Sequence, residues 1–127
     1  MALVAIITVG ALIQYVLLSV RVGQARGKYG VEAPAITGHP MFERRFRVHQ
    51  NTLEALIVFL PALWMCAYLF SAAVAAVLGI LFIAARFVYE RGYVEDPQKR
   101  GTGAIMTAVV LSLLLVSALI GAVIHLF

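Results

Sequence analysis

Charged residues are scarce in this sequence, and they are missing altogether from three long runs. Lys, Arg, Asp and Glu make up 13% of the 127 residues, whereas hydrophobic residues make up 63%. A soluble domain has roughly 45–50% apolar residues and about 25% charged ones, so this composition excludes an ordinary water-soluble core. The uncharged runs cover residues 2–20, 55–85 and 101–127. Their lengths predict helices that cross a membrane.

Cysteine is nearly absent as well. The single cysteine, Cys66, cannot form a disulfide within the chain, and a lone buried thiol most often has a packing role. No Cys, His and carboxylate spacing in the sequence matches a closed metal site. We therefore expect no metal.

The length of the middle run sets the number of membrane spans. Residues 55–85 form 31 consecutive uncharged positions, and as one helix they would reach about 46 Å, well beyond the roughly 30 Å of a hydrocarbon core. Two helices with a tight connection near Tyr68 to Ser71 fit better. The prediction is a single domain over residues 1–127, an all-α membrane protein with a four-transmembrane-helix bundle, whose spans are about 2–21, 44–68, 71–93 and 98–126.

The basic residues test this count. All ten Lys and Arg residues follow the first span or precede the fourth, at Arg21, Arg26, Lys28, Arg44, Arg45, Arg47, Arg86, Arg91, Lys99 and Arg100. Four spans place both groups on one side of the membrane, which the positive-inside rule makes cytoplasmic. We expect an integral membrane protein with its basic loops and active site facing the cytoplasm, in the inner or plasma membrane if the source is bacterial. The net charge of +4 is then explained by topology and lipid headgroups, without nucleic acid.

Glycine and proline mark the segment between the first two spans. Their density between residues 23 and 41 argues against one continuous helix and predicts an ordered loop there. Asp96-Pro97 predicts a helix start, with Asp96 as the N-cap and Pro97 in the first helical position.

Three polar residues are aligned where the second helix enters the membrane. Arg47, Asn51 and Glu54 follow one another at i, i+4 and i+7, which places them on one helix face. Polar side chains at that depth normally face a bundle interior or a water-filled cavity. Tyr89 and Tyr93 share a face of the third helix in the same way. Since Arg pairs with carboxylates, Glu with an amino group and Asn with amides, this set predicts an anionic, peptide-like ligand.

The order and spacing of these motifs resemble the MAPEG superfamily, the membrane-associated proteins of eicosanoid and glutathione metabolism. The resemblance rests on Arg47-x-His49-x-Asn51-x-x-Glu54, on Arg86-x-x-Tyr89-x-x-Gly92-Tyr93 and on a basic residue at Arg100. It implies a homotrimer that binds glutathione as a co-substrate between neighbouring subunits on the cytoplasmic side. The positions that match glutathione-binding positions are Arg26, Arg47, His49, Asn51, Glu54, Tyr89 and Tyr93. Arg100 matches the catalytic arginine that holds the thiolate.

The resemblance implies a glutathione transferase or peroxidase that acts on lipophilic electrophiles. Two departures bear on the substrate: Ala55 stands where some members have a tyrosine, and Gly27 stands where the leukotriene-forming members have a second arginine. The alternative is a non-catalytic, lipid-binding member of the family, but such a protein needs none of the polar set described above. A four-span exporter would need a carboxylate in its first span, and residues 2–20 contain none.

Overall fold

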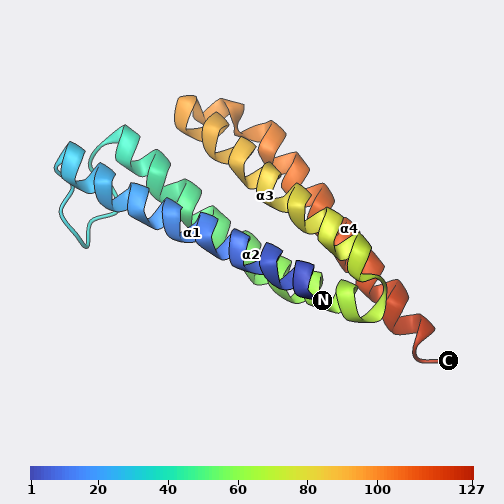
Figure 1. Cartoon of the computed structure of the whole chain (residues 1–127). Helices are drawn as coiled ribbons and strands as arrows, with labels where there is room; N and C mark the ends of the chain where they lie inside the picture. The colour runs from blue at the N-terminus through green and yellow to red at the C-terminus, as the bar shows by residue number, and fades with distance from the viewer.

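The computed structural model describes all 127 residues and consists of four long helices (Figure 1). They are α1 (Ala2–Tyr29), α2 (Pro40–Leu69), α3 (Ala72–Glu95) and α4 (Gly101–Ile124), with the short 3-10 helix η1 (Pro97–Arg100) just before α4. All four are long and apolar enough to cross a membrane. The prediction of an all-α protein with four membrane-spanning helices is therefore confirmed.

Local capping explains where the helices begin. The side chain of Ser71 accepts a hydrogen bond from the Val74 N–H at 3.3 Å at the start of α3. Only Phe70 and Ser71 connect α2 to α3. The Asp96 carboxylate accepts from the Gln98 N–H at 3.0 Å at the start of η1. These caps supply acceptors for N–H groups that have none inside the helix. The start signal read from Asp96-Pro97 is confirmed.

The prediction that a loop begins at residue 23 is wrong, because residues 23–29 are helical. α1 continues through Gly23 and ends at Tyr29, and Gly30 closes it in the left-handed conformation with φ 67°. Val22 and Ala25 are buried in a cluster with Val31 and Phe42. A glycine inside a helix costs roughly 0.5–1 kcal/mol, and this tertiary burial offsets that cost. The connection to α2 is correspondingly shorter, from residue 30 to residue 39.

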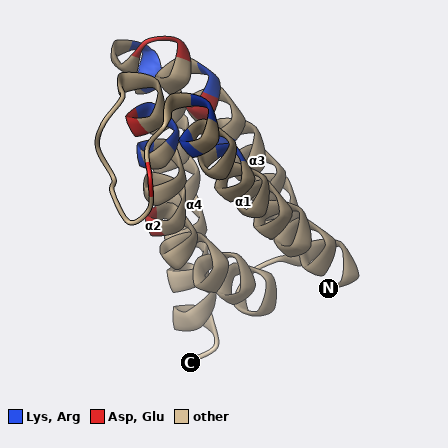
Figure 2. Ribbon diagram, turned by 90° about the vertical axis from the view of Figure 1, so that its left-hand side faces the viewer, with Lys and Arg blue, Asp and Glu red and all other residues tan.

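The charged residues gather at one end of the bundle (Figure 2). The chain termini lie at the other end. The α1–α2 loop and the α3–α4 connection lie at the charged end, so both groups of basic residues share one side of the bundle. At about 1.5 Å per residue, α1 and α2 measure roughly 42 and 45 Å, more than a hydrocarbon core of about 30 Å. Both helices can therefore carry their polar ends beyond the lipid tails.

The interior is packed by aromatic and small residues. α2 and α3 each contact all the other long helices, and the rings of Phe59 and Phe82 stack between them at 3.8 Å. Gly103 of α4 lies against the backbone of Tyr89 so closely that a Cβ there would overlap it. Since lipid tails are as apolar as the helices, such close packing and a few internal hydrogen bonds hold a membrane bundle together.

We predict opposite effects for two glycine substitutions. Gly103→Ala forces α3 and α4 apart, because the added Cβ meets backbone atoms that cannot rotate away. Overpacking of this kind costs about 1–3 kcal/mol. Gly23→Ala meets no atom within 4 Å and raises helix propensity, so we expect a gain of about 0.5–1 kcal/mol.

The measurement is thermal unfolding of the two purified variants in the same detergent, followed by helical circular dichroism. A loss of stability in Gly23→Ala would contradict the continuous α1. Unchanged stability in Gly103→Ala would contradict the close approach of α4 to Tyr89.

Candidate functional site

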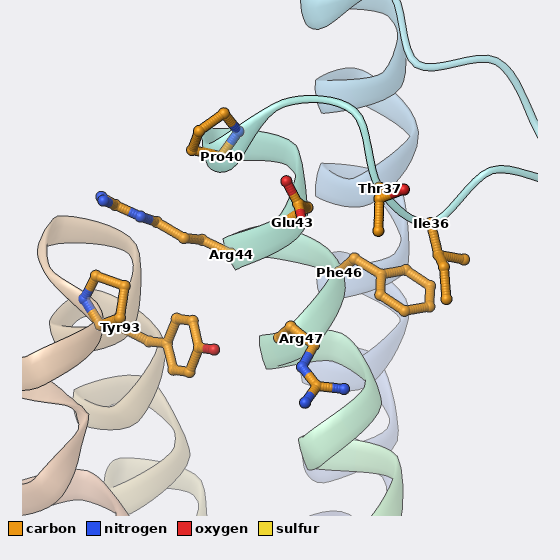
Figure 3. A pocket seen from close by; sticks show the side chains of 9 residues that line it. Ile36, Thr37, Pro40, Glu43, Arg44, Phe46, Arg47 and Tyr93 are labelled. Carbon is orange, nitrogen blue, oxygen red and sulfur yellow. The ribbon is translucent and has the colours of Figure 1, made fainter.

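A hollow of about 520 Å³ opens at the charged end of the bundle, between the start of α2 and the end of α3 (Figure 3). Tyr93 projects into it from α3, and Arg44 and Arg47 lie on the α2 side. The residues that line it include Glu43, Arg44, Phe46, Arg47, Tyr93 and Pro97. Two guanidinium groups beside one carboxylate give this hollow a positive surplus, which favours an anionic ligand.

Arg44 fixes the width of the hollow. Its Nη1 donates to the carbonyl oxygens of Val94 and Glu95 at 3.1 and 3.2 Å. These carbonyls belong to the last turn of α3, where no further N–H is available within the helix, and a cation there complements the helix dipole. Arg44 therefore ties the start of α2 to the end of α3. The sequence prediction did not include it, because the contact depends on how the two helices lie in space.

Asn51 and Tyr89 join the same two helices one turn deeper. The Asn51 Nδ2 donates to the Tyr89 hydroxyl at 2.6 Å, and the rings of Tyr89 and Tyr93 lie 5.7 Å apart. Arg100 approaches from η1, with its guanidinium 6.0 Å from the centre of the Tyr93 ring. The structure thus brings together five of the predicted site residues, namely Arg47, Asn51, Tyr89, Tyr93 and Arg100.

Arg47 and Glu54 have no charged partner within the chain. Arg47 donates only to the Gln50 side chain, at 3.3 Å. Glu54 is exposed on α2, and it makes neither a hydrogen bond nor an ion pair with any other residue. A carboxylate on the outer face of a membrane helix is costly unless something pairs with it. A ligand or a neighbouring molecule that contacts this face of α2 would remove that cost.

Arg26 and His49 make their contacts elsewhere. The His49 ring stacks on Tyr15 of α1 at 4.6 Å, and its Nε2 has no hydrogen-bond partner. Arg26 donates to the Ala35 carbonyl at 2.6 Å and lies 4.7 Å over the Phe42 ring. Neither side chain lines the hollow. The hollow itself is lined by Arg47 and Tyr93 of the predicted set. Asn51, Tyr89 and Arg100 adjoin Tyr93, whereas Arg26 and His49 lie apart from this cluster.

Arg86 is a buried cation directly below the Asn51–Tyr89 pair. Its Nη2 donates to the Thr52 hydroxyl at 2.8 Å and its Nη1 to the Thr107 hydroxyl at 3.4 Å. Each threonine gives its own proton to the carbonyl four residues earlier, so its oxygen lone pairs face the arginine. The guanidinium also lies 4.1 Å from the centre of the Tyr89 ring. Arg86 thereby fixes the orientation of Tyr89, a role that its position in the sequence did not reveal.

The fold and the site together define a four-span membrane protein with an open, positively charged polar site at one end. The sequence profile described as the MAPEG family matches residues 4–120, and the chain belongs to that family. A mouse protein named microsomal glutathione S-transferase 2 is 46% identical over 101 residues, which cover 80% of this chain and 69% of the mouse chain.

Two further relatives match more of the chain. Mouse leukotriene C4 synthase is 34% identical over 124 residues, covering 98% of this chain and 83% of its own length. An uncharacterized protein of Synechocystis is 42% identical over 116 residues, covering 91% and 85% of the two chains. The family therefore includes both glutathione-named transferases and a leukotriene synthase.

We predict that Tyr89→Phe destabilises the bundle at the site. The substitution removes the acceptor of the 2.6 Å hydrogen bond and leaves the half-buried Asn51 amide without a partner, which costs about 1 kcal/mol. Tyr29→Phe is the matched control, because the Tyr29 ring stacks on His39 while its hydroxyl makes no hydrogen bond to the protein. Thermal unfolding of both variants in one detergent tests this. Equal stability of the two would contradict a structural role for the Asn51–Tyr89 bond.

Proposed function

We propose that this protein is a membrane-bound glutathione transferase that joins the glutathione thiolate to lipophilic electrophiles. The observation that carries the proposal is the unpaired face of α2, where Arg47 lines an open hollow and Glu54 is exposed two turns further along the helix. Neither side chain has a charged partner within the chain. Glutathione presents two carboxylates, one amino group and two amides. Arg47 suits a carboxylate and Glu54 suits the amino group, while Asn51 and the tyrosine hydroxyls suit amides. The named relatives support the same chemistry.

A homotrimer would complete this site. Arg26 and His49 lie on the α1 side of the bundle, away from the hollow, although all of these positions match glutathione-binding positions of the family. Both groups meet one ligand if the face of α1 that carries Arg26 is turned toward the hollow of the next subunit. The exposed Glu54 supports this arrangement, because a neighbouring subunit would shield it from lipid. The proposed site then lies between subunits, and the positive-inside rule places it on the cytoplasmic side.

Arg100 is the residue proposed to activate the thiol. A free thiol has a pKa of roughly 8.5, and only the thiolate is a good nucleophile. Arg100 donates to the Pro97 carbonyl at 2.7 Å, and its remaining N–H groups are free to hold a sulfur anion. The thiolate then gives an electron pair to an electrophilic carbon, and a carbon–sulfur bond forms while a leaving group departs or an activated bond opens. An apolar electrophile reaches the site from the surrounding lipid.

We predict that Arg100→Ala lowers transfer activity at least tenfold, because each unit by which the pKa of the bound thiol rises above the assay pH removes about nine-tenths of the thiolate. Ultraviolet difference spectra of the protein titrated with glutathione measure the thiolate directly. Lys99→Ala is the control, since Lys99 is an exposed neighbour that pairs with Glu95 at 2.6 Å. The band should disappear in Arg100→Ala and persist in Lys99→Ala.

The other outcomes identify the alternatives. Glutathione binding without a thiolate band in the unmodified protein would contradict thiol activation and leave a binding protein. No glutathione binding at all would overturn the proposal and favour a lipid-binding member of the family.

We predict a ligand-specific loss in Glu54→Gln. A hydrogen bond to a charged group contributes about 1.5–3 kcal/mol, so affinity for glutathione should fall roughly ten- to a hundredfold. A glutathione analogue without the α-amino group should bind the original protein and Glu54→Gln equally weakly. Isothermal titration with both ligands tests this. An equal loss of affinity for both ligands in the variant would show that Glu54 does not face the amino group.

A further inference from the structure

A second charged cluster lies on the α1 side of the bundle, centred on a buried carboxylate. Glu90 of α3 is only 4% exposed, and its Oε1 accepts from Arg21 of α1 and, at 3.0 Å, from Arg45 of α2. One carboxylate thus joins three helices. Burying an ion is costly unless it is well paired, and the two arginines supply that pairing.

Glu90 occupies only part of the hydrogen-bonding capacity of Arg21 and Arg45. Their side chains remain 39% and 33% exposed, and each gives Glu90 only one nitrogen of its guanidinium. Arginine has five N–H donors in a planar fork. The remaining donors of Arg21 and Arg45 are therefore available to a second anion from outside the chain.

A basic groove surrounds these donors. Two hollows of about 520 and 370 Å³ share Arg21 and Arg45, and Lys28 and Arg91 line their outer parts. Four cations face two carboxylates, Glu90 and Glu95, and Glu95 already pairs with Lys99. The groove formed by Arg21, Lys28, Arg45 and Arg91 therefore carries a net positive charge, which is uncompensated within the chain.

This basic groove is separate from the candidate glutathione site. Arg45 and Arg47 are two residues apart on α2, and Arg91 and Tyr93 are two residues apart on α3. Residues two apart on a helix point to different sides. No residue lines both the glutathione-site hollow and the basic groove.

The surroundings of the groove identify the anion. Phe87 of α3 lines its wall and is 49% exposed, and α1 exposes Leu17 and Val20 in the turn before Arg21. The cations lie at the charged end of the bundle, where the helices leave the lipid, and the apolar residues lie on the membrane side of them. A phosphate group held by the cations, with acyl chains along the apolar residues, matches this division. A water-soluble phosphate would gain nothing from the apolar wall.

We propose that the basic groove is a binding site for the headgroup of an anionic phospholipid of the adjoining leaflet. The headgroup phosphate accepts from the outward N–H groups of Arg21 and Arg45, and Lys28 and Arg91 add charge at the rim. Because these arginines also hold Glu90, the bound lipid strengthens the contact of α1 with α2 and α3. The lipid therefore stabilises the bundle.

The test compares lipid binding to the full chain in detergent, measured by native mass spectrometry and by thermal unfolding. The probes are dioleoylphosphatidylglycerol and dioleoylphosphatidylcholine. Arg91→Gln and Lys28→Gln keep the Glu90 pairs intact, and each should weaken phosphatidylglycerol binding about fivefold. Arg47→Gln removes one cation from the same end but from the opposite side. It should leave phosphatidylglycerol binding unchanged and weaken glutathione binding, whereas Arg91→Gln should do the reverse.

Four results would overturn the proposal. The first is equal binding and equal stabilisation by the two lipids. The second is the same loss of phosphatidylglycerol binding in Arg47→Gln as in Arg91→Gln, which would indicate a general effect of net charge. The third is competition by glycerol phosphate as strong as that by the lipid, which would identify a site for a soluble phosphate. The fourth is lipid binding insensitive to Arg91→Gln and Lys28→Gln, as expected if a second copy of the chain covers the groove.

Discussion

A cation buried inside a membrane bundle needs hydrogen-bond acceptors around it. Arg86 is the buried cation of this bundle, and the packing around it follows from that need. Thr52 of α2 and Thr107 of α4 accept its hydrogen bonds, and the Tyr89 ring packs against its guanidinium. Thr107 donates to the carbonyl of Gly103, the residue whose missing side chain lets α4 approach Tyr89. Satisfying one buried charge therefore fixes three helices at the depth where the candidate site begins. The orientation of Tyr89, and through it that of Asn51, depends on this arrangement.

The two sides of the charged end differ in how their charges are satisfied. On the α1 side, Glu90 pairs with two arginines from other helices. The charge of Glu90 is therefore balanced within one chain, and its role is chiefly structural. On the hollow side, Arg47 and Glu54 come from the same α2 helix and have no charged partner. An unpaired carboxylate such as Glu54 on the outer face of a membrane helix is costly unless a ligand or a neighbouring molecule shields it from lipid. That contrast supports a ligand and a neighbouring subunit on the hollow side.

The sequence predicted those features that depend on local pattern and length. The 31-residue uncharged run required two helices, and Asp96-Pro97 marked the start of η1. The same local reasoning failed at Gly23, because the burial of Val22 and Ala25 against Phe42 is a long-range contact. For the site, spacing along one helix placed Arg47 with Asn51 and Tyr89 with Tyr93. The contacts of Arg44 with α3 and of Arg86 with two threonines depend on the register between helices. Residue spacing along one helix does not reveal that register.

The charge balance of the hollow bears on the chemistry proposed for it. Glu95 pairs with Lys99 and Glu90 with the arginines of the α1 side, so the remaining carboxylates at the hollow are Glu43, which lines it, and Asp96, which adjoins the lining residue Pro97. Arg44, Arg47 and Arg100 face or flank it. Glutathione as a thiol carries a net charge of −1, and as a thiolate it carries −2. A site with surplus cations binds the more negative form more strongly, which is equivalent to lowering the pKa of the bound thiol. Thiol activation would then follow from the same imbalance of charge that favours binding of the anion.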